Sequence, residues 1–230
     1  MEIFCIIPAR GGSKGIPGKN IMYFRGKPLL VHSIEYAKSV HRNIAVFVST
    51  DDEKIARVAE RAGAAFIPRP SELAGDEATT ESAIGHALLW WEERELIPDV
   101  IVLLQPTSPL RPPGSLDAAL DLFIENDYDS LLSISPSHRF FWRIQGNEAI
   151  PEYDYMKRPR RQDLSSTDLK YLENGSLYIF SRTQFLHSKN RLGGKIGYII
   201  FPDEYSIEID SQTDIDILEG VAARLEKRQR

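Results

Sequence analysis

Residues 3–20 read IFCIIPARGGSKGIPGKN, and this stretch decides the fold. The run from Ile3 to Ile7 is wholly apolar, which predicts a buried β-strand. It ends in a loop with four glycines, two prolines and three basic residues. In open α/β sheets, ligands bind beyond the carboxyl ends of the strands. We therefore expect a strand at residues 3–7 that delivers an anion-binding loop to the edge of a sheet.

Apolar runs and amphipathic segments alternate after this loop. Strands are predicted at residues 44–50, 64–68, 99–105, 130–135, 176–180 and 195–201. Helices are predicted at residues 27–40, 50–64, 79–95 and 114–127, and from about Ser211 onward. We expect the helix at 50–64 to begin with a capping box from Thr50 to Glu53 and to end at Gly63.

Continuous apolar strands between amphipathic helices are typical of a parallel sheet covered on both faces. We therefore predict an α/β fold, namely a Rossmann-like three-layer sandwich with a mainly parallel sheet. Residues 1–230 are expected to form a single domain. Residues 137–174 interrupt the alternation with a polar, aromatic and basic segment that is too long for a plain connection. This excursion is expected to be functional or to pack on a second subunit.

Composition narrows the class of protein. The net charge is -5, which argues against nucleic acid as the main partner. The single cysteine, Cys5, lies in the first apolar run and is expected to be a buried hydrophobe. No apolar stretch approaches the ~18 residues of a membrane span. We expect a cytoplasmic protein without a membrane partner.

The opening loop matches neither common phosphate-binding motif. A Walker A loop needs Ser or Thr after its lysine, and Asn20 follows Lys19 here; Ser13 stands where the motif requires glycine. The glycines also lack the spacing of a dinucleotide fingerprint. The alternative to an anion site is a glycine-rich connection with solvated lysines. Three basic residues at a strand end favour the anion site.

Two other strand ends and one late segment carry polar residues. Arg69 follows the strand at 64–68, and Gln105 ends the strand at 99–105. Glu208 and Asp210 stand two residues apart, so on an extended chain both carboxylates point to one face. Hard oxygen ligands beside phosphates suit Mg²⁺. The alternative is a solvent-facing edge that leads into a helix cap.

Taken together, seven stretches resemble the acylneuraminate cytidylyltransferases, the CMP-sialic acid synthetase family. They are PARGGSKGIPGKN, STDDEKIARVAERAGA, RPSELAGDEATTES, LLQPTSPLR, RRQDL, ENGSLYI and SIEIDSQTDIDILE, and they follow the family order. The resemblance implies a fold of the nucleotide-diphospho-sugar transferase type. It also implies a reaction in which CTP and a nine-carbon keto acid sugar give a CMP-sugar and pyrophosphate.

The resemblance also implies roles for individual residues. The residues that match the family's nucleotide contacts are Ala9, Arg10, Lys14, Lys19, Asn20, Arg69 and Ser82. The residues that match its catalytic positions are Arg10, Lys19 and Asp210. Sugar contacts fall to Gln105, Arg143, Arg161 and Tyr178. Glu208 and Asp210 are implied ligands of Mg²⁺, although the family usually has Asp at both positions. The family is homodimeric, and its excursion completes the sugar pocket of the partner.

The sequence leaves the sugar open. We expect CMP-N-acetylneuraminate or CMP-legionaminate synthesis; the alternatives are CMP-pseudaminate, CMP-deaminoneuraminate or a Kdo cytidylyltransferase. A hypothesis of another class is a non-catalytic nucleotide-binding module, in which the catalytic residues are free to vary. Arg10, Lys19 and Asp210 are all present, which favours the enzyme.

Overall fold

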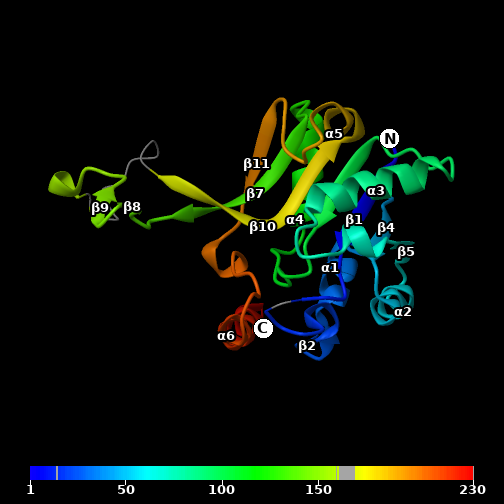
Figure 1. Ribbon diagram of the computed structural model, residues 1–230, viewed down its shortest axis with the longest axis horizontal. Coiled ribbons are helices and arrows are strands. Elements are labelled where there is room, and N and C mark those ends of the chain that lie inside the picture. The colour runs from blue at the N-terminus through cyan, green and yellow to red at the C-terminus, as the bar shows by residue number, and fades with distance from the viewer. Residues whose placement is uncertain (14, 159, 161–168, 230) are drawn as a thin grey trace.

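A seven-stranded sheet forms the centre of the computed structural model, which describes residues 1–13, 15–158, 160 and 169–229 (Figure 1). The strand order is β11-β7-β10-β6-β1-β4-β5. These strands are β1 (Ile3–Pro8), β4 (Ala45–Thr50), β5 (Ala65–Pro68), β6 (Val100–Leu104), β7 (Ser130–Ser137), β10 (Lys170–Ser181) and β11 (Ile196–Ile200). Neighbours are parallel except at β10, which is antiparallel to β6 and to β7. The expected mainly parallel sheet is confirmed.

Helices cover both faces of this sheet. On one face, α1 (Leu29–Lys38), α2 (Glu53–Arg61) and α4 (Ser115–Glu125) share a hydrophobic cluster with Cys5 and Ile7 of β1. On the other face, α3 (Thr80–Glu92) and α5 (Arg182–Ser188) pack on the alternate residues of β1, Phe4 and Ile6. The three-layer sandwich is confirmed, and Cys5 is fully buried.

A third cluster lies outside the sandwich. Helix α6 (Gln212–Gln229) packs its apolar stripe on Phe24 and Leu29, beside a short hairpin of β2 (Tyr23–Phe24) and β3 (Lys27–Pro28). No helix in the described parts of the chain has the length and hydropathy that crossing a membrane requires. Short 3-10 helices are η1 (Lys19–Ile21), η2 (Ser71–Leu73), η3 (Tyr155–Lys157) and η5 (Asp203–Tyr205).

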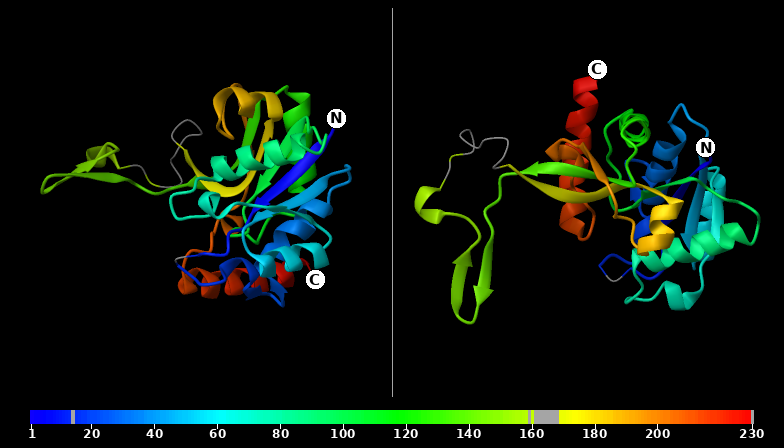
Figure 2. Two further views of the ribbon diagram at one scale, coloured as in Figure 1. Left: turned by 45° about the vertical axis from the view of Figure 1, so that its right-hand side comes forward. Right: turned by 90° about the horizontal axis from the view of Figure 1, so that it is seen from above.

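The excursion at 137–174 projects from the sandwich as an arm (Figures 1 and 2). It is more regular than its composition suggested, because β8 (Trp142–Gln145) and β9 (Glu148–Pro151) form an antiparallel hairpin near its tip. Two residues connect the strands, and Gly146 adopts the positive φ of 60° that such a turn favours. The Gly-Asn pair between two short runs was the sequence signal for this hairpin.

The cap of α2 differs from the expected capping box. The N-cap is Asp52 rather than Thr50, and its carboxylate accepts hydrogen bonds from the backbone N–H groups of Lys54 and Ile55. Thr50 is the last residue of β4, and its hydroxyl accepts from the Asp52 N–H. The strand ends at Thr50 as expected, but the helix begins two residues later than a cap at Thr50 would give.

Replacing Asp52 by Ala should lower the free energy of unfolding by about 1 kcal/mol, because two N–H groups of the first turn lose their acceptor. For a chain of this size we expect the melting temperature to fall by about 2–4 °C. Thermal unfolding followed by circular dichroism measures the change. Asp52→Asn is the control, since its side-chain oxygen still caps; equal losses in both variants would contradict the assignment.

Candidate active site

A cavity of about 350 Å³ opens where three parallel strands end. Pro8 is the last residue of β1, Arg69 directly follows β5, and Gln105 directly follows β6. The lining residues are Pro8, Arg10, Ser13, Gly15, Lys19, Asn20, Arg69, Ala78, Thr79, Thr80, Gln105, Pro106, Thr107 and Asp210. The structure thus brings together six of the residues singled out in the sequence: Arg10, Lys19, Asn20, Arg69, Gln105 and Asp210.

The opening loop is fixed by backbone contacts. The Gly11 N–H donates to the Asp51 carboxylate at 2.9 Å, and the Asn20 side-chain amide donates to the Arg10 carbonyl at 2.9 Å. Asn20 is buried, so its amide holds the two ends of the loop together. A β-carbon at Gly11 would lie 2.9 Å from the Asp52 side chain, which explains the glycine. The loop is therefore a preformed wall of the cavity.

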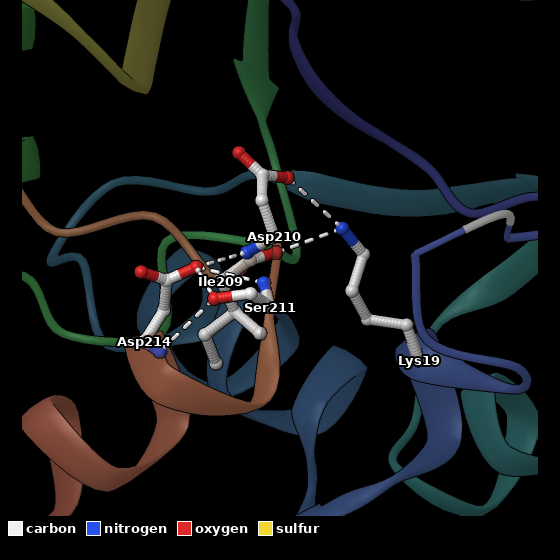
Figure 3. Close-up of polar contacts among 5 residues, drawn as sticks. All are labelled: Lys19, Ile209, Asp210, Ser211 and Asp214. Atoms are coloured by element: carbon white, nitrogen blue, oxygen red, sulfur yellow. Dashed lines mark hydrogen bonds and ion pairs between the residues drawn. The ribbon is translucent and has the colours of Figure 1, made fainter.

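Lys19 connects this loop to the other end of the chain (Figure 3). Its ammonium group donates to the Ile209 carbonyl at 2.7 Å and pairs with the Asp210 carboxylate at 3.2 Å. The Lys19 side chain is only 13% exposed, whereas that of Asp210 is 78% exposed. Gly15 also lies against this segment, since its β-carbon would come within 2.6 Å of the Asp210 carbonyl oxygen. A partly buried cation thus orients an accessible carboxylate at the rim.

The cap of α6 holds Asp210 from its other side. The Asp214 carboxylate accepts hydrogen bonds from the backbone N–H groups of Asp210 and Ser211 and from the Ser211 hydroxyl (Figure 3). These bonds lower the pKa of Asp214, so it stays ionised at the helix N-terminus. The segment therefore leads into a helix cap, which the sequence offered as the alternative to a metal site.

Arg10 reaches across the cavity mouth. Its guanidinium group donates to the Gly75 carbonyl at 2.7 Å and lies 3.4 Å from the Asp76 carboxylate. Gly75 and Asp76 follow η2 in the loop between β5 and α3. A carboxylate beside Arg10 competes with any anionic ligand for that cation.

Arg69 is buried beneath the same mouth, with 8% of its surface exposed. It donates to the Ser49 carbonyl at 2.7 Å, while its Nε atom has no hydrogen-bond partner in the described part of the chain. Burial lowers the pKa of Arg69; nearby Asp51 raises it, and Arg10 lowers it further. A desolvated cation beside a second cation favours an anion between them.

Glu208 is half-buried behind Asp210. Burial raises the pKa of Glu208, the neighbouring Asp210 charge raises it further, and Lys19 partly offsets this. The described residues contain no cluster of three or more candidate metal ligands. Two adjacent carboxylates that repel each other nevertheless fit Mg²⁺, which takes its remaining ligands from phosphate and water. The pair lies outside any strand of the sheets, so no strand pairing fixes this segment.

Three other predicted residues are not among those that line the cavity. Ala9 is fully buried in the core, and its N–H donates to the Ser49 carbonyl. The Ser82 hydroxyl donates to the Thr79 carbonyl within the first turn of α3. Tyr178 is 2% exposed, and its hydroxyl donates to Glu173. Their predicted contacts with nucleotide and sugar remain predictions.

The remaining predicted residues are placed elsewhere. Arg143 lies on β8, which Figure 1 shows near the tip of the arm, far from the sandwich. Lys14 and Arg161 lie outside the described residues.

The cavity also has walls that sequence reasoning missed. Ser13 and Gly15 lie inside the loop already singled out, and Thr107 stands two residues after Gln105. Thr79 caps α3 and Thr80 begins it. The sequence did contain a signal for these residues, because each lies just after a predicted strand or at the start of the next predicted helix.

Comparison with known proteins agrees with this geometry. A family model described as Cytidylyltransferase matches residues 4–224. The chain belongs to the cytidylyltransferase family. The opening loop, the strand-end residues and the Glu208–Asp210 segment all fall within the matched region.

Curated relatives confirm the resemblance to the acylneuraminate cytidylyltransferases. N-acylneuraminate cytidylyltransferase A of Danio rerio is 36% identical over 95% of this chain and 50% of its own length. The Streptococcus agalactiae (serotype V) enzyme is 31% identical over 93% of this chain and 52% of its own length. The chain thus spans about half the length of these relatives. Pseudaminic acid cytidylyltransferase of Campylobacter jejuni is 31% identical, with 94% of each chain covered.

Solved structures show the same fold. CMP:2-keto-3-deoxy-manno-octonic acid synthetase complexed with CTP aligns with a TM-score of 0.70 at 17% identity, over 97% of this chain and 99% of that one. 4-diphosphocytidyl-2C-methyl-D-erythritol synthase aligns with a TM-score of 0.68 at 12% identity, over 96% and 99%.

The Arg10–Asp76 contact leads to a test of the cavity as an anion site. Asp76→Asn should strengthen binding of a nucleoside triphosphate by about two- to fivefold, because an exposed ion pair contributes ~0.2–1 kcal/mol that the ligand must displace. Calorimetric titration with CTP measures the affinity. Asp117→Asn, on α4 in the sandwich, is the control and should leave it unchanged. Weaker binding in Asp76→Asn would show that Asp76 supports the ligand instead.

Proposed function

We propose that this protein transfers CMP from CTP to the anomeric hydroxyl of a nonulosonic, sialic-type acid and releases pyrophosphate. The observation that carries the proposal is the gathering of Arg10, Lys19 and Arg69 beside the accessible Asp210 carboxylate at the strand ends. Membership of the cytidylyltransferase family supports the reaction type. The names of the relatives support an acidic nine-carbon sugar as acceptor.

In this reaction the anomeric oxygen attacks the α-phosphorus and forms a new P–O bond. The bond from the α-phosphorus to the bridging oxygen breaks, pyrophosphate leaves, and the hydroxyl proton passes to water. Negative charge grows on the α-phosphoryl oxygens and on the leaving group. The fixed cations Arg10 and Lys19 stabilise that charge more strongly in the transition state than in the ground state.

We propose Mg²⁺ as the cofactor, held by Glu208 and Asp210. When bound, it neutralises phosphate charge and polarises phosphoryl oxygens. The chain's own contribution is orientation. Lys19 holds the Asp210 backbone segment from one side, and the Asp214 cap holds it from the other. Gln105, which lines the same cavity at the end of β6, is proposed to contact the sugar.

We propose a homodimer in which the arm of one subunit brings Arg143 and Arg161 to the cavity of the other. The arm exposes large apolar side chains, namely Phe141, Trp142, Ile144, Tyr155 and Met156. The edge strand β11 also exposes three alternating residues, Ile196, Tyr198 and Ile200. Apolar surface gathered in this way is typical of a protein interface. Two arginines from the partner arm supply bidentate donors for the sugar carboxylate.

Pyrophosphate release in the presence of CTP and Mg²⁺ tests the function. The acceptor panel contains N-acetylneuraminic, legionaminic, pseudaminic and deaminated neuraminic acids, with Kdo as an eight-carbon control. We expect release with one nonulosonic acid, N-acetylneuraminic or legionaminic acid first, and none when ATP, UTP or GTP replaces CTP. Binding of CTP without release for any acceptor would support the non-catalytic module.

Asp210→Ala should lower turnover by about a hundredfold or more, because the accessible carboxylate of the proposed metal pair is lost. The Mg²⁺ concentration for half-maximal rate should rise as well. Steady-state kinetics at varied Mg²⁺ measures both. Asp216→Asn, an exposed change on α6, is the control; activity of Asp210→Ala equal to that of the control would rule out the metal pair.

Ile144→Glu should convert the protein from dimer to monomer, because a charge at a buried interface position remains unpaired. Ile144 is 72% exposed in the single chain, so the subunit itself should fold normally. Size-exclusion chromatography with light scattering gives the mass. Ile217→Glu, at another exposed isoleucine on α6, should remain a dimer. A monomeric wild-type protein would exclude the proposed assembly.

A further inference from the structure

One buried arginine has no role in the reaction described above. Arg111 lies in the loop between β6 and α4 and is 7% exposed. Burial lowers its pKa to about 10, and no carboxylate of the described chain offsets that effect. A buried cation without a counter-charge is destabilising unless its donors are satisfied by hydrogen bonds. Its contacts therefore show what the fold gains from it.

Arg111 joins three elements through backbone and hydroxyl oxygens. Its Nη2 atom donates to the Gln105 carbonyl at 2.8 Å and to the Ser176 carbonyl at 3.0 Å. Its Nη1 atom donates to the Ser33 hydroxyl of α1 at 3.1 Å, and its Nε atom lies 3.3 Å from the Ser176 carbonyl. The guanidinium plane also lies over the Tyr36 ring, 5.1 Å from its centroid. One rigid fork thus fixes the end of β6 to the middle of β10.

Each of the two carbonyls that Arg111 binds lies within two residues of a group that contacts the segment from Glu208 to Asp210. Two residues after Gln105, the Thr107 carbonyl accepts a hydrogen bond from the Ile209 N–H at 2.8 Å. One residue before Ser176, Gly175 lies against Glu208, since its β-carbon would come within 2.6 Å of the carboxylate. The segment from Glu208 to Asp210 therefore contacts two backbone segments that Arg111 ties together just beyond the last ladder pair, Leu104 with Leu177.

We propose that Arg111 is a positioning residue that sets the placement of Glu208 and Asp210 without touching substrate. Its effect on turnover rests on the proposed function, whereas its effect on the backbone does not. A lysine keeps the charge but has no planar fork, so it does not bridge the Gln105 and Ser176 carbonyls in one geometry. Arg111→Lys is therefore the informative variant.

The first measurement is hydrogen–deuterium exchange in the full-length protein. In Arg111→Lys we expect the Ile209 amide and the amides around Gly175 to exchange about tenfold faster, because their backbone supports loosen. Leu120→Ala is the control. This change truncates a fully buried side chain of α4, so it lowers global stability while every hydrogen bond of Arg111 keeps its donor and acceptor. Its exchange should rise evenly across the core.

The second measurement is cation binding and turnover. Titration with Mn²⁺ in the presence of CTP, followed by electron paramagnetic resonance, should show weaker Mn²⁺ binding in Arg111→Lys than in Leu120→Ala. Turnover should fall about tenfold or more, with a change of less than about threefold in the KM for CTP, since the nucleotide contacts are untouched. If no acceptor sugar is found, the exchange and Mn²⁺ data still decide the proposal.

Equal exchange patterns in Arg111→Lys and Leu120→Ala would overturn the proposal, as would unchanged Mn²⁺ binding in Arg111→Lys. If Arg111→Lys does not fold, Ser33→Ala replaces it, because that change removes one hydrogen bond of Arg111 and leaves the guanidinium in place. Ser33→Ala should then give a smaller acceleration at Ile209 and Gly175. No local acceleration in that variant would also overturn the proposal.

Discussion

The hydrogen bond from the Lys19 ammonium group to the Ile209 carbonyl closes the site, because it joins the first loop of the chain to the last. The same ammonium group pairs with the Asp210 carboxylate, so one side chain holds the backbone and orients the acid. Around it, the Thr107 carbonyl and the Asp214 cap hold the remaining polar groups of this segment. Apolar packing adds to these bonds, because Ile209 is fully buried in the cluster that contains Phe24 and Leu29. The geometry of the site depends on satisfied hydrogen bonds around a partly buried charge, which makes it sensitive to small changes in the surrounding backbone.

Local patterns predicted the sandwich and the residues that follow its strands. Apolar runs and helical spacing are local signals, and parallel strands place their ends at one edge, so Arg10, Arg69 and Gln105 could be expected together. The predicted cap at Thr50 was wrong by two residues, because Thr50, Asp51 and Asp52 are all residue types that can cap a helix and the structure uses Asp52. The β8–β9 hairpin was missed because its strands are short and exposed.

Contacts between distant residues were beyond any local pattern. Arg111 reads as a surface residue in a Pro-rich loop, since its burial depends on carbonyls that β6 and β10 bring together only in the folded chain. Lys19 reads as one of several loop cations, although the fold gives it a partner near the C-terminal helix. The sequence shows which residues are charged, but it does not show which of those side chains the fold buries. Burial distinguishes Arg69, and partial burial Lys19, from the solvated lysines of the surface.

Strand β10 begins in the arm and ends in the centre of the sheet, with a register shift between Glu173 and Tyr178. Gly175 lies at this irregularity with a positive φ of 65°, and Glu208 rests on it. The arm is therefore continuous with the strand against which Glu208 lies, and the register of that strand shifts around Gly175. In the proposed dimer, a displacement of the arm is transmitted along β10 to Gly175, which Glu208 contacts. Subunit association and catalytic activity are then thermodynamically linked. Dilution of the protein, which dissociates the dimer, would lower the activity per subunit.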